Sequence, residues 1–114
     1  PAGFITGLSD PRLSRALAAM HDQPGESWTL SSLAEQAGMS RTAFANSFRD
    51  IVGQTPLDYL TDWRIALAQR RLRQGRPIKT LADELGYANA SALSRVFTAK
   101  TGMSPREWLK QAQA

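Results

Sequence analysis

The sequence predicts an all-α fold of two helix-turn-helix subdomains, about seven helices in all, joined by a long central helix. Three observations support this prediction: a long segment with helix start and stop signals, apolar residues at helical spacing on both sides of it, and an internal repeat. Residues 1–9 are expected to be a linker remnant. Residues 10–54 then form the first subdomain, 55–75 the connecting helix and 76–114 the second subdomain.

The connecting helix has the clearest boundary signals in the chain. Thr55 is a suitable N-cap, Pro56 occupies the first helical position, and Asp58 places a negative charge at the positive end of the helix dipole. Gly75 ends the helix because glycine adopts the left-handed conformation at little cost. Apolar side chains cover about half of the circumference, so we expect the helix to pack in both subdomains. They are Leu57, Leu60, Trp63, Ile65, Leu67, Ala68 and Leu72.

A first helix is predicted to start at Asp10-Pro11 and to end at Gln23-Pro24-Gly25. Its apolar residues recur at positions i, i+3, i+4 and i+7, so one face packs against a core. We expect His21 to be a surface or capping side chain, because no second type of metal ligand lies nearby. The apolar face consists of Leu13, Ala16, Leu17 and Met20.

Two shorter helices follow and form the first helix-turn-helix unit. Thr29 caps a helix that stops at Gly38, and Ser40 caps a second helix that stops at Gly53. In the second helix the apolar residues point one way, and small or polar residues lie on the opposite side. A tight glycine turn between two such helices is typical of helix-turn-helix units.

The same pattern recurs after the connecting helix. LAEQAGM at 33–39 corresponds to LADELGY at 81–87, an offset of 48 residues, and later positions match at an offset of 49. Core, turn and cap positions match together, which indicates a duplicated unit. Ser104 to Glu107 form a capping box that starts the last helix, whose Trp108 and Leu109 are expected to close the second core. The later matches pair Phe44 with Leu93, Phe48 with Phe97, Gly53 with Gly102, Pro56 with Pro105, Tyr59 with Trp108 and Leu60 with Leu109.

Charge favours a nucleic acid or another anionic surface as partner. The net charge is +4, the isoelectric point is near 10.1, and six basic but no acidic residues lie between Trp63 and Lys79. The sequence has no cysteine, which excludes disulfides and thiolate metal sites and fits a cytoplasmic protein. No apolar run is long enough to span a membrane, so we expect no membrane association.

The length of the connecting helix indicates how two such units would read DNA. Roughly twenty residues at about 1.5 Å each span about 30 Å, and one turn of B-DNA advances about 34 Å. The two recognition helices are therefore expected to enter successive major grooves on one face of a duplex. Because both units belong to one chain, the predicted site is asymmetric, with two different half-sites in tandem.

Enzyme activity is not expected. One histidine, no cysteine and no glycine-rich phosphate loop leave no set of residues that resembles an active site. We expect neither a cofactor nor a metal ion. Two alternatives to specific DNA binding stay open: a helical protein-interaction module, and a fragment that binds DNA only through electrostatic attraction.

The segment GYANASALSRVFTAKTGMSPREWL, at 86–109, resembles the second-repeat signature of the AraC/XylS transcription regulators, and the resemblance covers nearly the whole chain. It implies recognition of double-stranded DNA and regulation of transcription, more often activation, with RNA polymerase as a further partner. In that family the module usually follows an effector-sensing or dimerising domain. The isolated domain is therefore expected to be monomeric, and the full-length protein dimeric through that other domain.

The resemblance also implies which residues of the first recognition helix contact DNA. Thr42, Ala45 and Asn46 would read bases, and Arg41 or Arg49 would contact phosphate. Asn46 suits an adenine, with about 1–3 kcal/mol of discrimination, whereas Ala45 offers only apolar contact, for example with a thymine methyl group.

The corresponding residues of the second recognition helix are Ala90, Ser91, Ser94 and Arg95. Arg95 suits a guanine, which an arginine can contact through two hydrogen bonds. Thr98-Ala99 stand where relatives often carry two lysines, so the charges that would anchor phosphate at this turn are missing.

Arg64 and Arg71 of the connecting helix project toward its apolar side by the helical count. A guanidinium in such a position needs a carboxylate or carbonyl partner. We expect a structural ion pair, with Arg64 as the better candidate. The candidate carboxylates are Glu35, Asp83 and Glu84.

Overall fold

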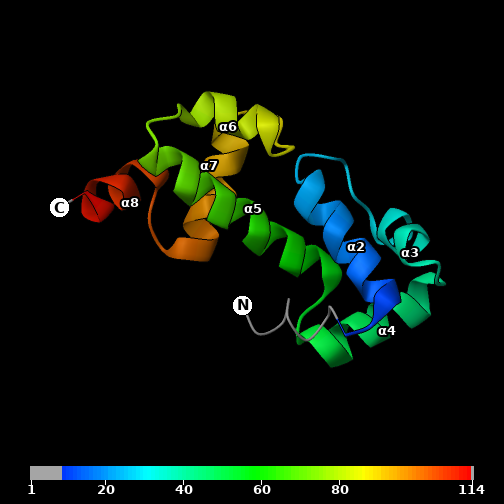
Figure 1. Cartoon of the computed structure of the whole chain (residues 1–114). Helices are drawn as coiled ribbons and strands as arrows, with labels where there is room; N and C mark the ends of the chain where they lie inside the picture. The colour runs from blue at the N-terminus through cyan, green and yellow to red at the C-terminus, as the bar shows by residue number, and fades with distance from the viewer. Residues whose placement is uncertain (1–8, 114) are drawn as a thin grey trace. The chain divides into compact units, whose positions relative to one another are not determined.

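The computed structural model describes residues 9–113, which form seven α-helices and no strands (Figure 1). This confirms the all-α fold. The predicted linker remnant, 1–9, lies outside the described residues except for Ser9. None of these seven helices combines the length and the apolar character needed to cross a membrane. The helices are α2 (Pro11–Asp22), α3 (Leu30–Ala37), α4 (Arg41–Val52), α5 (Pro56–Arg73), α6 (Ile78–Glu84), α7 (Ala90–Thr101) and α8 (Pro105–Ala112).

The chain divides into two compact units, Pro1–Thr61 and Asp62–Ala114, and the division falls within α5. Each unit has its own hydrophobic core. The start of α5 supplies Tyr59 and Leu60 to the first core, and the rest of α5 supplies four residues to the second. The prediction that one helix packs in both subdomains is therefore confirmed, while the exact subdomain boundaries stay a prediction. The four residues are Ile65, Leu67, Ala68 and Leu72.

In the first unit, α2 packs on the pair formed by α3 and α4, and its predicted apolar face is fully buried. Asp10 caps α2 by accepting a hydrogen bond from the backbone N–H of Arg12 at 2.9 Å, which holds the pKa of this carboxyl below its ordinary value. The Arg15 guanidinium donates to the carbonyl oxygens of Gln36 at 3.3 Å and Ala37 at 3.0 Å. Arg15 therefore joins α2 to the end of α3 and satisfies carbonyls that lack a partner within that helix.

The expectation that His21 is a surface or capping side chain is wrong. His21 is half-buried, its Nε2 lies 2.9 Å from the Tyr59 hydroxyl, and the two rings stack with centroids 5.9 Å apart. Burial lowers the pKa of His21 and raises the pKa of Tyr59. The contact joins α2 to α5 across 38 positions of sequence, so no local pattern predicts it.

In the second unit, α6, α7 and α8 pack with the rest of α5 around a core that includes Leu93 and Phe97. The rings of Phe97 and Trp108 meet edge to face, with centroids 5.7 Å apart. This confirms that Trp108 closes the second core. The Arg73 guanidinium lies 5.0 Å from the centroid of the Trp108 ring. Lys100 of α7 pairs with Asp62 of α5 at 2.9 Å.

The boundaries of α5 follow the predicted signals closely. Thr55 accepts a hydrogen bond from the Asp58 N–H at 3.2 Å, which confirms the N-cap. The helix ends at Arg73, two residues before Gly75, and Gly75 turns the chain with φ of +85°. Leu57 departs from the prediction: it is 43% exposed, because it lines a hollow on the surface of the first unit and does not enter the core.

Arg71 forms an ion pair with Glu84, one of the three candidate carboxylates. The better candidate for such a pair from the sequence is Arg64. The Arg71 Nη1 lies 3.0 Å from Glu84 Oε1, and Arg76 contacts the other oxygen of the same carboxylate. Arg64 lies over the Tyr87 ring, 5.5 Å from its centroid, which places a cation on an aromatic face. An ion pair at Arg64 stays a prediction.

Candidate nucleic-acid interface

The recognition helix of the first unit is α4, and its orientation is fixed by its cap and its core residues. Ser40 accepts a hydrogen bond from the Ala43 N–H at 3.2 Å and so sets the first turn. Phe44 and Phe48 are fully buried, with ring centroids 5.7 Å apart, and Phe48 also meets the Tyr59 ring edge to face. With these rings in the core, the opposite face of α4 is turned outward.

The predicted DNA-contacting residues of α4 lie on this outward face. Arg41, Thr42, Asn46 and Arg49 are exposed, and Ala45 is half-buried. Ala45 and Arg49 also line a surface hollow of about 200 Å³, together with residues from α3 and the start of α5. The placement suits contact with a duplex, and the individual DNA contacts stay a prediction.

The recognition helix of the second unit is α7, and it repeats this arrangement. The Asn89 side chain accepts a hydrogen bond from the Ala92 N–H at 2.8 Å, so α7 begins with a capped first turn. Leu93 and Phe97 are fully buried and correspond to Phe44 and Phe48 of the first unit. The duplicated sequence therefore gives duplicated packing, with one buried and one exposed helix face in each unit.

Of the predicted residues on α7, Ser91 and Arg95 are exposed, while Ala90 and Ser94 are half-buried. Thr98 continues the same face one turn later, but its hydroxyl already donates to the Ser94 carbonyl at 2.8 Å. The exposed cation on this part of the face is therefore Arg95, which suits the base contact predicted for it.

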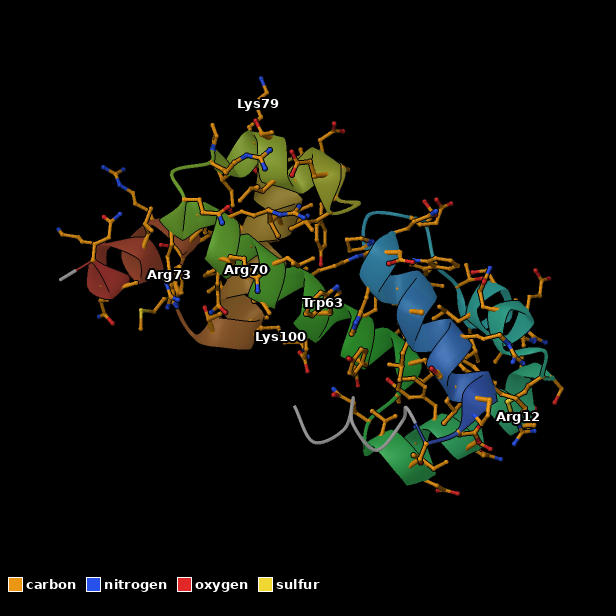
Figure 2. All side chains as sticks on the ribbon, viewed as in Figure 1. Arg12, Trp63, Arg70, Arg73, Lys79 and Lys100 are labelled. Carbon is orange, nitrogen blue, oxygen red and sulfur yellow. The ribbon has the colours of Figure 1, made fainter. Side chains whose placement is uncertain are left out.

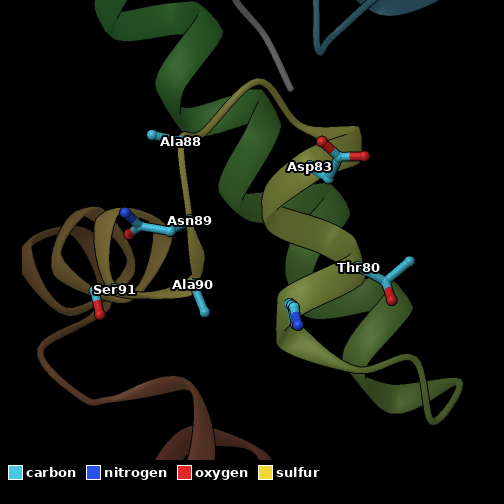
Figure 3. Close-up of a pocket in the computed structure, with 7 residues that line it drawn as sticks. Thr80, Asp83, Ala88, Asn89, Ala90 and Ser91 are labelled. Atoms are coloured by element: carbon cyan, nitrogen blue, oxygen red, sulfur yellow. The ribbon is translucent and has the colours of Figure 1, made fainter.

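An open hollow of about 610 Å³ lies beside the start of α7 in the second unit (Figure 3). Figure 3 shows its walls on two neighbouring ribbons: Thr80 and Asp83 lie on α6, Ala88 and Asn89 lie just before α7, and Ala90 and Ser91 begin α7. Lys79 of α6 also lines the hollow and extends away from the ribbon in Figure 2.

Ala90 and Ser91 are predicted interface residues, but their neighbours across the hollow, Lys79, Thr80 and Asp83, are not among the residues predicted to contact DNA. The internal repeat could have indicated that these three residues lie near the interface. The three positions precede or fall within LADELGY, so they belong to the first helix of the second helix-turn-helix unit.

The described residues offer little for metal chemistry. Within residues 9–113, no three His, Cys, Asp or Glu side chains are grouped so that they could hold a metal ion. The polar character of the exposed α4 and α7 faces comes instead from arginine, serine, threonine and asparagine side chains, which are the groups that proteins use on phosphates and base edges.

Known proteins share this architecture. Residues 33–111 match the family model described as a helix-turn-helix domain. A protein of Streptomyces antibioticus named as an AraC-like transcription regulator is 44% identical over 96% of this chain and 36% of its own length. RclR of Escherichia coli K12, named as an RCS-specific HTH-type transcriptional activator, is 37% identical over 96% of this chain and 39% of its own length.

Among solved structures, the chain is similar to the DNA-binding domain of AdpA, a global transcriptional factor solved in complex with a target DNA. The TM-score is 0.79 at 27% identity, over 91% of this chain and 94% of that one. The chain spans little more than a third of the length of the two sequence relatives. The matched family model and these similarities show that the chain belongs to the AraC family of helix-turn-helix transcription regulators.

Proposed function

We propose that this chain binds double-stranded DNA sequence-specifically, with α4 and α7 each in a major groove, and that it regulates transcription as an activator. The observation that carries the proposal is the shared design of the two helices. Each helix buries two large apolar residues and turns a face of short polar side chains and arginine outward. A helix of this kind suits the major groove, which is wide enough to admit it.

We further propose that the residues on the outward faces of α4 and α7 have different roles. Asn46 and Arg95 read bases, because their side chains can form paired hydrogen bonds with adenine and guanine respectively. Thr42, Ala45, Ser91 and Ser94 supply shorter contacts. Arg41 and Arg49, at opposite ends of the exposed face of α4, contact phosphates and fix the register of the helix.

We also propose that the two helices occupy successive major grooves and read an asymmetric tandem site. Two features support this: the units are repeats within one chain, and α5 is an uninterrupted helix of 18 residues. At about 1.5 Å per residue, such a helix is about 27 Å long, somewhat less than the advance of one duplex turn, about 34 Å.

Activation is proposed from the relatives. RclR is named as a transcriptional activator and is 37% identical to this chain. Activation would involve a contact with RNA polymerase. The isolated domain is proposed to be monomeric, since its two units need no second copy to provide two reading helices, and the full-length protein to be dimeric through a further domain.

The decisive experiment is selection of bound sequences from a random duplex pool by the purified chain. We expect two unlike motifs in tandem, separated by about one helical turn, or about 10 base pairs. A palindromic motif would contradict the asymmetric site, and a single short motif would contradict the use of both helices.

Titration of the selected duplex and of a scrambled duplex, each at two salt concentrations, distinguishes the proposed function from the two alternatives. A protein-interaction module binds neither duplex. A nonspecific binder shows a steep salt dependence and no preference, whereas the proposed regulator keeps its preference as salt rises. Transcription in vitro with purified RNA polymerase and the selected site then tests activation, which predicts more transcript when the chain is added.

A further inference from the structure

The hollow beside α7 carries one cation and one carboxylate among its lining residues, Lys79 and Asp83. The two lie four positions apart on α6, which places them on the same side of that helix. Both are exposed, and neither forms an ion pair with any residue that the structure describes. Their charges are therefore available to a ligand that approaches the hollow.

We propose that Lys79 and Asp83 act as opposing charges that set the sequence-independent part of the affinity for DNA. Lys79 contacts a backbone phosphate beside the groove that α7 enters, and Asp83 weakens that contact. The inference rests on the proposed function, because it needs α7 to bind a duplex. It adds two residues that the predicted set of DNA contacts does not include.

The position of the hollow supports the phosphate contact. Ala90 and Ser91 line it and also belong to the face that α7 turns toward the major groove. Side chains at the edge of such a face lie over the phosphates that border the groove. Further along α7, Thr98 and Ala99 are exposed but uncharged, and Lys100 is paired with Asp62, so Lys79 supplies a positive charge that these three positions do not offer to a phosphate.

Asp83 opposes the contact in two ways. Its carboxylate repels the phosphate directly, and in the free protein it attracts the Lys79 ammonium, which lies one helical turn away. Neither effect depends on base identity, because every nucleotide carries the same phosphate. Asp83 therefore changes total affinity and salt dependence without changing the preferred sequence.

The stability of α6 does not account for an acid at position 83. Asp83 lies in the last turn of α6, where the helix dipole disfavours a negative charge. The next residue, Glu84, also lies there but is paired with Arg71 and Arg76. The repeat places Glu35 at the equivalent position, in the last turn of α3, and it is likewise exposed. Both units thus keep an acid at a position that costs helix stability.

The test measures binding of the whole 114-residue chain to the selected duplex and to a scrambled duplex across a series of salt concentrations. Lys79→Ala is expected to weaken binding to both duplexes by the same factor and to reduce the salt slope by about one. Asp83→Asn is expected to strengthen binding to both by about two- to fivefold, and Asp83→Glu to bind like the unaltered chain.

Matched controls change the same charges elsewhere. Lys110→Ala in α8 and Asp22→Asn at the end of α2 alter net charge equally but lie outside the hollow, so the salt slope should stay unchanged. Because Lys79 and Asp83 are exposed, the thermal melts of Lys79→Ala and Asp83→Glu should match that of the unaltered chain, and Asp83→Asn should melt at the same or a slightly higher temperature, since it removes a negative charge from the last turn of α6. Asp83→Ala provides a second neutral variant, which should behave like Asp83→Asn.

Four results would overturn the inference. An unchanged salt slope in Lys79→Ala, with specific binding retained, removes the phosphate contact but leaves the proposed function intact. Equal gains in Asp83→Asn and Asp22→Asn show an effect of net charge alone. A changed base preference in Asp83→Asn makes this carboxylate a base-reading group. If the unaltered chain binds neither duplex, the proposed function fails, and the inference fails with it.

Discussion

The Glu84 carboxylate accepts a hydrogen bond from the Arg71 guanidinium at 3.0 Å and so joins the last turn of α6 to the last turn of α5. Arg76, in the connection between these helices, contacts the same carboxylate. The side chains of Arg71 and Glu84 are only 27% and 33% exposed, so solvent screens their interaction less than it screens a fully exposed pair. The Glu84 carboxylate thus holds α6 against the end of α5 and against the connection between the two helices.

Replacing this carboxylate is expected to destabilise the chain. Glu84→Gln should lower the free energy of unfolding by about 0.5–1.5 kcal/mol, because two guanidinium groups lose their charged partner. Urea denaturation at low and high salt checks this, and the difference should shrink as salt rises. Asp83→Asn, one residue earlier, removes the same charge without breaking an ion pair, so equal losses in the two variants would contradict the role of the pair.

The stacked pair of His21 and Tyr59 predicts a dependence of stability on pH. Burial lowers the pKa of His21, so the folded chain binds fewer protons than the unfolded chain near the ordinary histidine pKa of about 6.5. The contribution of the neutral His21 to the free energy of unfolding is therefore fully present above the ordinary histidine pKa. It decreases as the pH falls through that value toward the lowered pKa of the folded chain. Chemical denaturation of the unaltered chain should give a lower free energy of unfolding at about pH 5.5 than at about pH 7.5.

The control for this prediction is His21→Gln, which can still contact the Tyr59 hydroxyl but does not titrate. Its free energy of unfolding should change less between the same two pH values. An equal change in both proteins would assign the pH dependence to other groups. Tyr59→Phe separates the hydrogen bond from burial, since it removes the hydroxyl but keeps the ring that stacks on His21.

Gly102 ends α7 with φ of +81°, in the left-handed region that side chains disfavour. A Cβ built there meets no atom within 4 Å, so the cost of substitution is conformational and not steric. Gly102→Ala is expected to lower the free energy of unfolding by about 1–2 kcal/mol. Gly102→Asn should cost less, because asparagine tolerates this conformation, and equal losses in thermal or urea unfolding would contradict the explanation.

The helices and the cores could be predicted from the sequence because their signals are local. Caps such as Thr55 and Ser40, the glycines that end helices, and the spacing of Phe44 and Phe48 all act within a few residues. Because the second unit repeats the first, its helices and core residues could be predicted from those of the first, including the burial of Phe97. The outward faces of α4 and α7 follow directly from these buried positions.

The features that were not predicted depend on contacts between distant segments. His21 has its partner on α5, and no spacing within α2 reveals it. The hollow between α6 and α7 exists only when both helices are packed, so the sequence alone shows Lys79 only as part of a basic run. Arg64 and Arg71 lie on the same helix, and only the folded unit shows that Glu84 pairs with Arg71.

Arg95 provides the sharpest test of base reading. It is exposed on α7, and the neighbouring Thr98 hydroxyl is already engaged with the Ser94 carbonyl, so Arg95 is the group on this part of the face that can bind guanine through two hydrogen bonds. Arg95→Ala is expected to cost about 1–3 kcal/mol on the selected duplex and to abolish the preference at one base position.

The measurement compares the selected duplex with four versions that differ only at the affected base pair. For the unaltered chain one version should bind best, and for Arg95→Ala all four should bind equally, because the group that distinguishes them is gone. Arg106→Ala removes an exposed arginine from the first turn of α8, outside the α7 face, and should leave the preference intact. If Arg95→Ala weakens all four versions by the same factor and keeps the preference, Arg95 contacts phosphate, because a phosphate contact adds the same energy to every sequence.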